Sequence, residues 1–121
     1  MHRILPPKEP QMSIRSIDPS FHVTSQIKPS QLREIAELGF KTVICMRPDK
    51  EGFLQPSFEE VEEAARGAGL EAHYLPVIPG SISFDQARQL KELLANQSGP
   101  ILAYCASGMR CVAAYDLAKR A

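Results

Sequence analysis

The sequence has no long apolar run and no excess of one charge, and each absence excludes a class of protein. No stretch of the 121 residues approaches the ~20 consecutive apolar residues that cross a membrane. Lysine and arginine number 14, as do aspartate and glutamate. The chain therefore lacks the basic surplus of proteins that bind nucleic acid or anionic membranes. We expect neither a membrane nor a nucleic-acid partner.

Cysteine is also scarce. The three cysteines are an odd set without the spacing of a disulfide framework, which predicts a reducing compartment and a chemical use of the thiols. Cys105 and Cys111 lie close in sequence, but no second cysteine or histidine pair has zinc-site spacing, so we expect no metal and no cofactor. Residues 1–8 lack the apolar core of a secretory signal. These observations predict a cytoplasmic protein.

Alternating strand and helix patterns predict an α/β domain. Short apolar or β-branched runs predict strands at residues 21–24, 41–46, 71–77 and 101–104. Helical patterns predict helices at residues 29–39, 57–67, 83–96 and 112–118. Strands and helices that alternate in this way are typical of layered α/β proteins.

The length of the chain suits one domain with a sizeable core. Prolines within residues 1–12 predict a flexible N-terminal arm, which leaves residues 13–121 as the folded domain. The sequence stops at Ala121, inside the last helical pattern. Because a helix that has just begun rarely closes a domain, we expect the domain to be truncated at its C-terminus.

The segment from Ile101 to Cys111 carries the chemistry. An apolar run ends at Cys105, a turn of small residues with Gly108 follows, and Arg110 precedes a helical pattern. A strand, a tight loop and a helix in this order form an anion cradle, because the loop N–H groups and the helix N-terminus point toward one place. The same field lowers the pKa of a thiol from about 8.5 into the range of roughly 3.5–7.5.

We predict that Cys105 is a nucleophile and that Arg110 binds the anion with its guanidinium fork. The predicted anion-binding loop consists of Ala106, Ser107, Gly108, Met109, Arg110 and Cys111. The structural alternative is a buried cysteine that acts as a small hydrophobe. For Cys111 we expect a supporting role, either packed under the loop or as a thiol that resolves a persulfide or sulfenic acid on Cys105.

Three further residues are candidates for the border of the pocket. Arg47 and Asp49 follow the predicted strand 41–46, at the end of a strand where ligands bind in open α/β sheets. Ordinary surface pairing is the alternative for both. Asp85 falls in the first turn of the predicted helix 83–96, where it serves either as a substitute acid or as a partner of the helix dipole.

Three stretches of the sequence carry motifs of a known family. They are Gln26-Ile27 with Leu32, Gly39 and Phe40; Lys41-Thr42-Val43-Ile44 followed by Arg47-Pro48-Asp49; and Cys105-x-Ser107-Gly108-x-Arg110. In these stretches the sequence resembles the phosphatase-like domain of bacterial beta-lactamase hydrolase-like proteins. The resemblance implies a fold of the dual-specificity phosphatase type, with a central, mostly parallel sheet and helices on both faces.

The resemblance also bears on substrate and partners. It implies a small anionic substrate, either a sulfane-sulfur donor or a phosphate ester. Family members occur alone or fused to a metallo-hydrolase domain of sulfide metabolism, which implies a fused or separate partner of that kind. Both phosphatase and sulfurtransferase roles have been attached to the family, so the resemblance leaves the reaction open.

Two departures from the phosphatase pattern favour sulfur transfer. Four residues separate Cys105 from Arg110, one fewer than in cysteine phosphatases and the number seen in many rhodanese-type sulfurtransferases. A smaller ring of N–H groups suits one sulfane sulfur better than a phosphoryl group. Residues 76–81 include no carboxylate where phosphatases carry the general acid, and without a proton donor an alkoxide leaves about 10²–10⁴-fold more slowly.

Our leading hypothesis from the sequence is a sulfurtransferase in which Cys105 carries a persulfide and passes the sulfur to a small thiol. The alternative at the same site is a phosphatase that works through a phosphocysteine. A third hypothesis is a non-catalytic module that binds an anion or a partner, although the presence of both Cys105 and Arg110 counts against it.

Overall fold

Strands and helices alternate along the chain as expected. The computed structural model describes residues 12–97 and 99–121. The elements are β1 (Arg15–Asp18), β2 (Phe21–Thr24), the 3-10 helix η1 (Pro29–Gln31), α1 (Leu32–Glu37), β3 (Thr42–Cys45), α2 (Phe58–Gly67), β4 (Glu71–Tyr74), α3 (Phe84–Asn96), β5 (Ile101–Tyr104) and α4 (Met109–Arg120). The predicted N-terminal arm, apart from Met12, lies outside the described residues.

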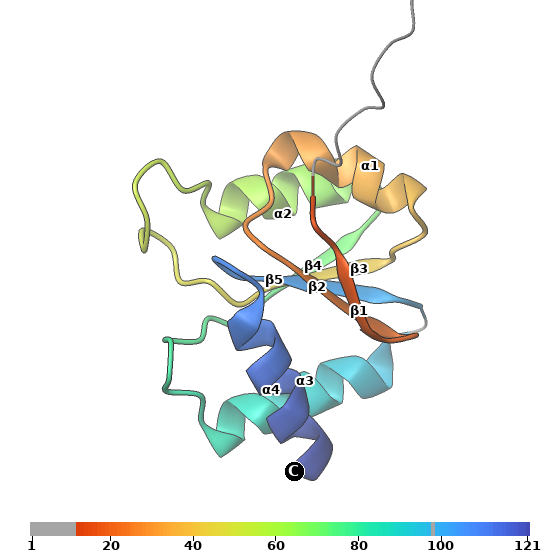
Figure 1. The fold of residues 1–121 in the computed structure, drawn as a ribbon. Helices are drawn as coiled ribbons and strands as arrows, with labels where there is room; N and C mark the ends of the chain where they lie inside the picture. Colours follow the sequence, from red (N-terminus) through yellow and green to blue (C-terminus); the bar gives the residue numbers. More distant parts are fainter. Residues whose placement is uncertain (1–11, 98) are drawn as a thin grey trace, which may run out of the picture.

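The five strands form one sheet in the order β1-β2-β5-β3-β4 (Figure 1). β1 is antiparallel to β2, whereas β2, β5, β3 and β4 are parallel. In this register Tyr104 of β5 is opposite both Thr24 of β2 and Cys45 of β3. The parallel strands therefore end side by side, and the loops that follow them share the carboxyl edge of the sheet.

Helices cover both faces of the sheet, with α1 and α2 on one face and α3 and α4 on the other (Figure 1). Side chains alternate along β5 because a strand has a period of two. Ile101 and Ala103 pack with α3 and α4, while Leu102 and Tyr104 pack with α1 and α2. Cys105 continues the alternation and lies on the α4 side. The predicted α/β fold with a central, mostly parallel sheet is confirmed.

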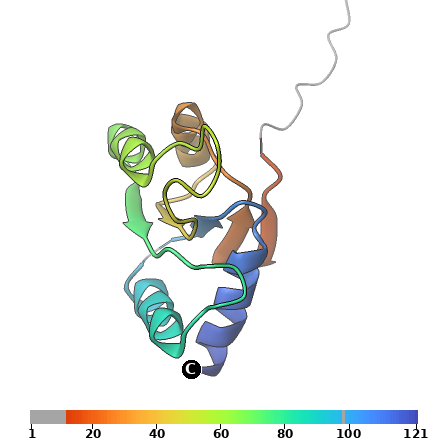
Figure 2. The ribbon, with the colours of Figure 1, turned by 90° about the vertical axis from the view of Figure 1, so that its left-hand side faces the viewer.

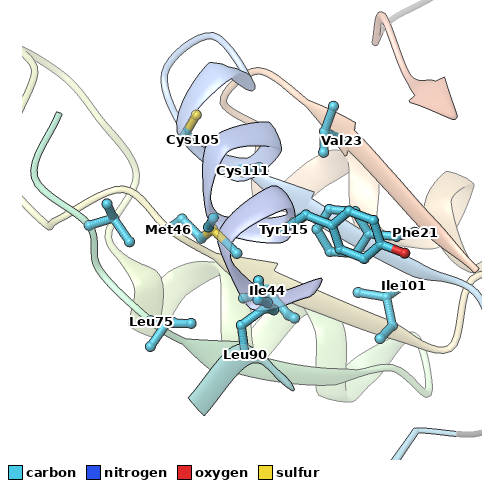
Figure 3. Packing of buried hydrophobic residues seen from close by; sticks show 14 of the residues in the cluster. Phe21, Val23, Ile44, Met46, Leu75, Leu90, Ile101, Cys105, Cys111 and Tyr115 are labelled. Carbon is cyan, nitrogen blue, oxygen red and sulfur yellow. The ribbon is translucent and has the colours of Figure 1, made fainter. Parts of the chain in front are cut away.

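An aromatic contact fixes α4 to the sheet. The ring of Tyr115 stacks on Phe21 of β2, with ring centroids 4.3 Å apart (Figure 3). The Tyr115 hydroxyl also donates a hydrogen bond to the carboxylate of Asp18 in β1. These contacts hold α4 at mid-length, and its first turn therefore stays beside the end of β5.

Local signals set most of the element boundaries. Ser57 and Ser83 cap α2 and α3 through the capping boxes that the sequence predicts. The strand predicted at 71–77 is shorter in the structure, where β4 ends at Tyr74. Past Tyr74, the N–H groups of Leu75 and Val77 still donate to carbonyl oxygens of Cys45 and Met46. Pro76 between them has no N–H to donate, so the regular ladder stops.

Two further differences from the predicted elements concern the ends of the chain. β1 was not predicted, since it is a short and mostly exposed edge strand. The last helix begins at Met109 and ends at Arg120, beyond the predicted 112–118 at both ends. Its earlier start follows from Gly108, which serves as its N-cap. Within residues 12–97 and 99–121, every helix is too short or too polar to span a bilayer.

Candidate active site

Cys105 follows β5 directly and lies at the carboxyl edge of the sheet, where its side chain is 0% exposed. Its sulfur accepts a hydrogen bond from the Gly108 N–H, with an N–Sγ distance of 2.9 Å. Gly108 has a φ of +92°, in the left-handed region that glycine adopts at little cost. This conformation turns the chain back toward Sγ and opens α4 at the next residue.

The surroundings of Cys105 hold its pKa at about 5, well below that of a free thiol. The largest cause is a hydrogen bond from the Cys111 side chain, and the backbone N–H groups of Ser107, Cys111 and Arg110 add to it. Burial acts in the opposite direction and is outweighed. Cys105 is therefore a thiolate at neutral pH, and the hydrogen bond from the Cys111 side chain is the largest single contribution to this.

Cys111 remains protonated beside this thiolate. Burial and the neighbouring Cys105 raise the pKa of Cys111 well above its ordinary value. Its side chain is 0% exposed, in the first turn of α4. The Cys111 thiol thus acts as a hydrogen-bond donor to Cys105.

Arg110 is held by Glu51 in an end-on pair. The Nη1–Oε2 and Nη2–Oε1 distances are 2.8 and 2.7 Å. Nη1 also donates to the carbonyl oxygen of Val77, at 2.9 Å. Within the described part of the chain, the Nε–H and the second Nη2 hydrogen have no partner. Those two N–H groups lie on one edge of the guanidinium, so the arrangement leaves one fork free to bind two oxygens of an anion.

Glu51 is the functional residue that the sequence analysis missed. The same carboxylate accepts a hydrogen bond from Nε of Arg47 at 3.0 Å, and Nη1 of Arg47 donates to Gln26 at 3.2 Å. Hydrogen bonding to Arg110, and secondarily to Arg47, lowers the pKa of Glu51 and keeps it ionised. One signal was available, because Glu51 is a carboxylate in the same polar loop as Arg47.

The other predicted border residues have local partners. The Asp49 carboxylate accepts from the N–H of Phe58 at the start of α2, at 2.8 Å. Asp85 pairs with Arg88 of its own helix at 2.7 Å. Arg47 alone among the three border candidates is connected to Arg110, and the connection runs through Glu51. No group of three or more metal-ligating side chains occurs among residues 12–97 and 99–121.

Two loops flank the cradle, and Figure 2 shows both next to the segment that joins β5 to α4. We call residues 46–57 the β3–α2 loop and residues 75–83 the β4–α3 loop. Each presents exposed apolar side chains, Phe53 and Leu54 on the first and Ile78 on the second. Met109 on α4 is also exposed. With these segments in place, the Cys105 side chain has no exposed surface.

The β4–α3 loop contacts Arg110 but brings no acid to the site. Val77 offers only its backbone carbonyl, and the stretch from Pro76 to Ser81 contains no carboxylate. The carboxylate that contacts Arg110 is Glu51, which is ionised. The site therefore holds an activated nucleophile and an anion fork without a protonated carboxyl group in contact with them.

The fold is the one found in the cysteine phosphatases. A solved Neisseria meningitidis protein, classed as a candidate phosphatase, is 32% identical, with a TM-score of 0.77 over 83% of this chain and 71% of that one. Kinase associated phosphatase, solved with its catalytic site cysteine changed to serine, is 12% identical and shows the fold alone. Its TM-score is 0.65 over 83% of this chain and 65% of that chain.

The chain belongs to the family described as beta-lactamase hydrolase-like protein, phosphatase-like domain, whose model matches residues 13–121. The beta-lactamase hydrolase-like protein of Xylella fastidiosa (strain Temecula1) is 31% identical over 108 residues. The match takes in 89% of this chain but only 25% of the relative, so the chain spans about a quarter of its length. The resemblance inferred from the sequence is confirmed. These comparisons support the phosphatase alternative and give no support to the sulfurtransferase hypothesis.

Proposed function

We propose that this domain hydrolyses phosphate monoesters through a phosphocysteine intermediate on Cys105. The observation that carries the proposal is the pairing of a Cys105 thiolate with an Arg110 fork that Glu51 leaves free. A thiolate is a nucleophile at neutral pH, and a planar fork of two N–H groups matches two phosphoryl oxygens. Membership of a phosphatase-like family supports the same reaction.

In the first step the Cys105 sulfur attacks phosphorus. An S–P bond forms, the P–O bond of the ester breaks, and the leaving oxygen keeps the electron pair. The Nε–H and Nη2–H of Arg110 bind the phosphoryl oxygens whose charge is redistributed in the transition state. Glu51 does not touch the substrate in this scheme, and acts by holding Arg110 through the other edge of its guanidinium.

In the second step water attacks phosphorus and the S–P bond breaks. Inorganic phosphate departs, and Cys105 returns to the thiolate. The Cys111 thiol stabilises that thiolate by its hydrogen bond, which makes the sulfur a better leaving group. This assigns to Cys111 a role in the breakdown of the intermediate.

The missing acid predicts the substrate class. An alkyl ester needs a proton on its leaving oxygen, and its absence lowers the rate by about 10²–10⁴. An aryl ester releases a phenolate that leaves without one. We therefore propose small aryl phosphates or phosphotyrosine as substrates, and the exposed Ile78 and Met109 near Arg110 offer apolar surface for an aromatic ring.

Sulfur transfer stays a second candidate because of one observation, the four-residue spacing between Cys105 and Arg110. Thiosulfate would give a Cys105 persulfide by formation of an S–S bond, with sulfite as the leaving group. A small thiol would then remove the outer sulfur. Neither of these steps needs a carboxylic acid.

Side-by-side assays on one preparation test the proposal. An aryl phosphate, a phosphotyrosine peptide and an alkyl phosphate measure hydrolysis, while thiosulfate with cyanide measures sulfur transfer. We expect hydrolysis of the two aryl esters and little hydrolysis of the alkyl ester. In Cys105→Ser we expect both hydrolysis and any sulfur transfer to be lost. Cys45→Ser is the matched control, because Cys45 packs on the other face of the sheet. Sulfur transfer that depends on Cys105, without hydrolysis that depends on it, would overturn the proposal.

A further inference from the structure

Arg15 places a positive charge beside the cradle, and the proposed reaction does not use it. A Cβ added to Gly108 would lie 3.0 Å from Nη2 of Arg15. Gly108 is also the residue whose N–H donates to the Cys105 sulfur, with an N–Sγ distance of 2.9 Å. The guanidinium of Arg15 therefore lies against the turn that holds the nucleophile.

The register of the sheet explains how a residue of β1 reaches this turn. β1 is antiparallel to β2, and Arg15, the first residue of β1, is opposite Val23. β2 ends at the next residue, Thr24, whose carbonyl oxygen would lie 3.4 Å from the same added Cβ on Gly108. The edge strand β1 thus begins at the carboxyl edge of the sheet and presents Arg15 there.

The guanidinium of Arg15 is free to bind a ligand. Arg15 is exposed, and within residues 12–97 and 99–121 its side chain has no hydrogen bond or ion pair. Arg47 and Arg110 differ in this respect, because both are paired with Glu51. A guanidinium keeps its charge at all ordinary pH values and has five N–H donors, which suits it to carboxylates. Arg15 is thus an unpaired cation next to the cradle.

A groove lies between β1 and α4, and its volume is about 410 Å³. Apolar side chains line both of its sides, Ile17 from β1 and Met109, Val112 and Ala113 from α4. Met109 is also part of the cradle, so the groove starts beside the anion site and continues along α4. Pockets of about 300–1,000 Å³ are the usual size for a bound ligand, and this groove has room for amino-acid side chains.

The carboxylates of the groove are held by neighbouring groups. The Asp18 carboxylate accepts a hydrogen bond from the Tyr115 hydroxyl. Asp116 pairs with Arg120 of its own helix at 2.8 Å. Neither carboxylate pairs with Arg15 within the part of the chain that the structure describes. An apolar groove with a free cation at its cradle end is complementary to a ligand that is partly apolar and negatively charged.

We propose that Arg15 selects phosphotyrosine peptides that carry an aspartate or glutamate next to the phosphotyrosine. The inference deepens the proposed function and rests on it, because the phosphoryl group must occupy the cradle. Arg15 then binds the neighbouring carboxylate, and the groove between β1 and α4 takes apolar residues of the peptide. A peptide suits this surface better than a small ester, because successive residues about 3.8 Å apart extend from the cradle along the groove.

Binding to Cys105→Ser tests the inference without turnover, because that variant lacks the nucleophile. Two pairs of fluorescent phosphotyrosine peptides are used, one with Asp or Asn before the phosphotyrosine and one with Asp or Asn after it. Asp and Asn have nearly the same shape and differ in charge. We expect one Asp peptide to bind about fivefold more tightly than its Asn partner, the upper range for an exposed ion pair. The ratio should fall as salt is added.

The same titrations in variants of Cys105→Ser assign the preference to a residue. We expect Arg15→Ala to bring the Asp-to-Asn ratio close to one, and Arg66→Ala, which removes an exposed arginine of α2, to keep it. Circular dichroism spectra like that of the parent protein show that the variants are folded. Equal weakening of all four peptides by Arg15→Ala overturns the inference. Loss of the preference in Lys119→Ala, at the other end of the groove, in place of Arg15→Ala also overturns it.

Hydrolysis of the same peptides by the wild-type protein separates this inference from the proposed function. Wild-type hydrolysis together with equal binding of Asp and Asn peptides overturns the role of Arg15 and leaves the phosphatase reaction in place. If the wild type hydrolyses none of the peptides and Cys105→Ser binds none, both the inference and the proposed phosphotyrosine substrate are wrong.

Discussion

The cradle after β5 and the β3–α2 loop leave neighbouring strands at the same edge of the sheet, but they shape the site by different means. The cradle acts through backbone N–H groups and through Cys111, all within a few residues of Cys105. The β3–α2 loop acts through the Glu51 side chain, 59 residues from Arg110 in the sequence. Activation of the nucleophile is therefore local, whereas orientation of the anion ligand depends on a distant loop.

The two segments also differ in how their backbone is held. The cradle places glycine at its left-handed position. The β3–α2 loop places Lys50 and Leu54 in the left-handed region, on either side of Glu51. That strain is sustained by contacts such as the Gln55 amide, which bonds to the Gly52 N–H and the Pro48 carbonyl. Substitutions in the two segments should therefore change different measured quantities.

The largest effect is expected from Arg110→Lys. A lysine ammonium cannot pair end-on with Glu51 and also offer a planar fork to the substrate. We expect kcat/KM for an aryl phosphate to fall by about 10²–10³, the loss typical of a donor that stabilises transition-state charge. Arg66→Lys, at an exposed α2 position with a loose 3.8 Å pair to Glu62, is the matched control. Equal rates for Arg110→Lys and wild type would remove Arg110 from the mechanism.

Gly108→Ala should disturb the cradle itself. An added Cβ would lie 3.4 Å from the Thr24 carbonyl oxygen and 3.0 Å from the Arg15 guanidinium, at a φ that disfavours alanine by about 1–2 kcal/mol. We expect loss of stability of that order and a higher pKa for Cys105, because the N–H bond to its sulfur is displaced. The pH profile of iodoacetamide labelling measures the pKa. An unchanged profile would show that the cradle does not set it.

Glu51→Gln should affect anion binding without affecting the thiolate. The amide cannot balance the charges of both Arg47 and Arg110 or accept at both oxygens, so the fork loses its fixed orientation. We expect kcat/KM to fall by about 10-fold, in the range of one charged hydrogen bond, with an unchanged pH profile of Cys105 labelling. Glu62→Gln on α2 is the control. A Glu51→Gln variant with wild-type kinetics would contradict the positioning role.

Stability should depend on pH through Cys105. Its pKa is about 5 in the folded protein, against an ordinary value of 9.0. A group with a lowered folded pKa stabilises the fold fully above its unfolded pKa, and this contribution disappears as the pH falls through the folded value. The free energy of unfolding of the wild type relative to Cys105→Ser should thus rise between about pH 5 and 9. Denaturant titrations of both proteins across this range measure the difference. If Cys105 has an ordinary pKa in the folded protein, the difference in free energy of unfolding will not change with pH.

The smallest effect is expected from Lys50→Asn. Asparagine adopts the left-handed conformation more readily than lysine, and Lys50 has a φ of 64° on the exposed loop. We expect a gain in stability of about 0.5 kcal/mol and little change in activity. Thermal unfolding measures the first. A destabilised variant would show that Lys50 has a role beyond its backbone angle.

The extent to which sequence predicts this molecule follows the same division between local and distant contacts. The capping boxes at Ser57 and Ser83 lie within four residues, and they placed α2 and α3 correctly. The apolar run before Cys105 placed β5, the strand at the centre of the sheet. β1 escaped prediction because an exposed edge strand has no apolar pattern to reveal it.

In the candidate site, too, the contiguous part was predictable from the sequence and the contact between distant loops was not. The motif from Cys105 to Arg110 is contiguous, so its residue types and spacing indicate an anion cradle directly. The Arg110–Glu51 pair depends on how two loops fold together, and neither residue predicts the other in sequence. Asp85, in turn, was a reasonable acid candidate by position, and its partner proved to be Arg88 on its own helix.

Capture of the covalent intermediate tests the central claim most directly. The protein is mixed with an aryl phosphate, quenched in acid within the first turnovers, and analysed by mass spectrometry of the intact chain and its tryptic peptides. The account predicts the added mass of one phosphoryl group on peptide 92–110, at Cys105, and none in Cys105→Ser. Turnover of the ester with no adduct on Cys105, or with the phosphoryl group on another residue, would contradict it.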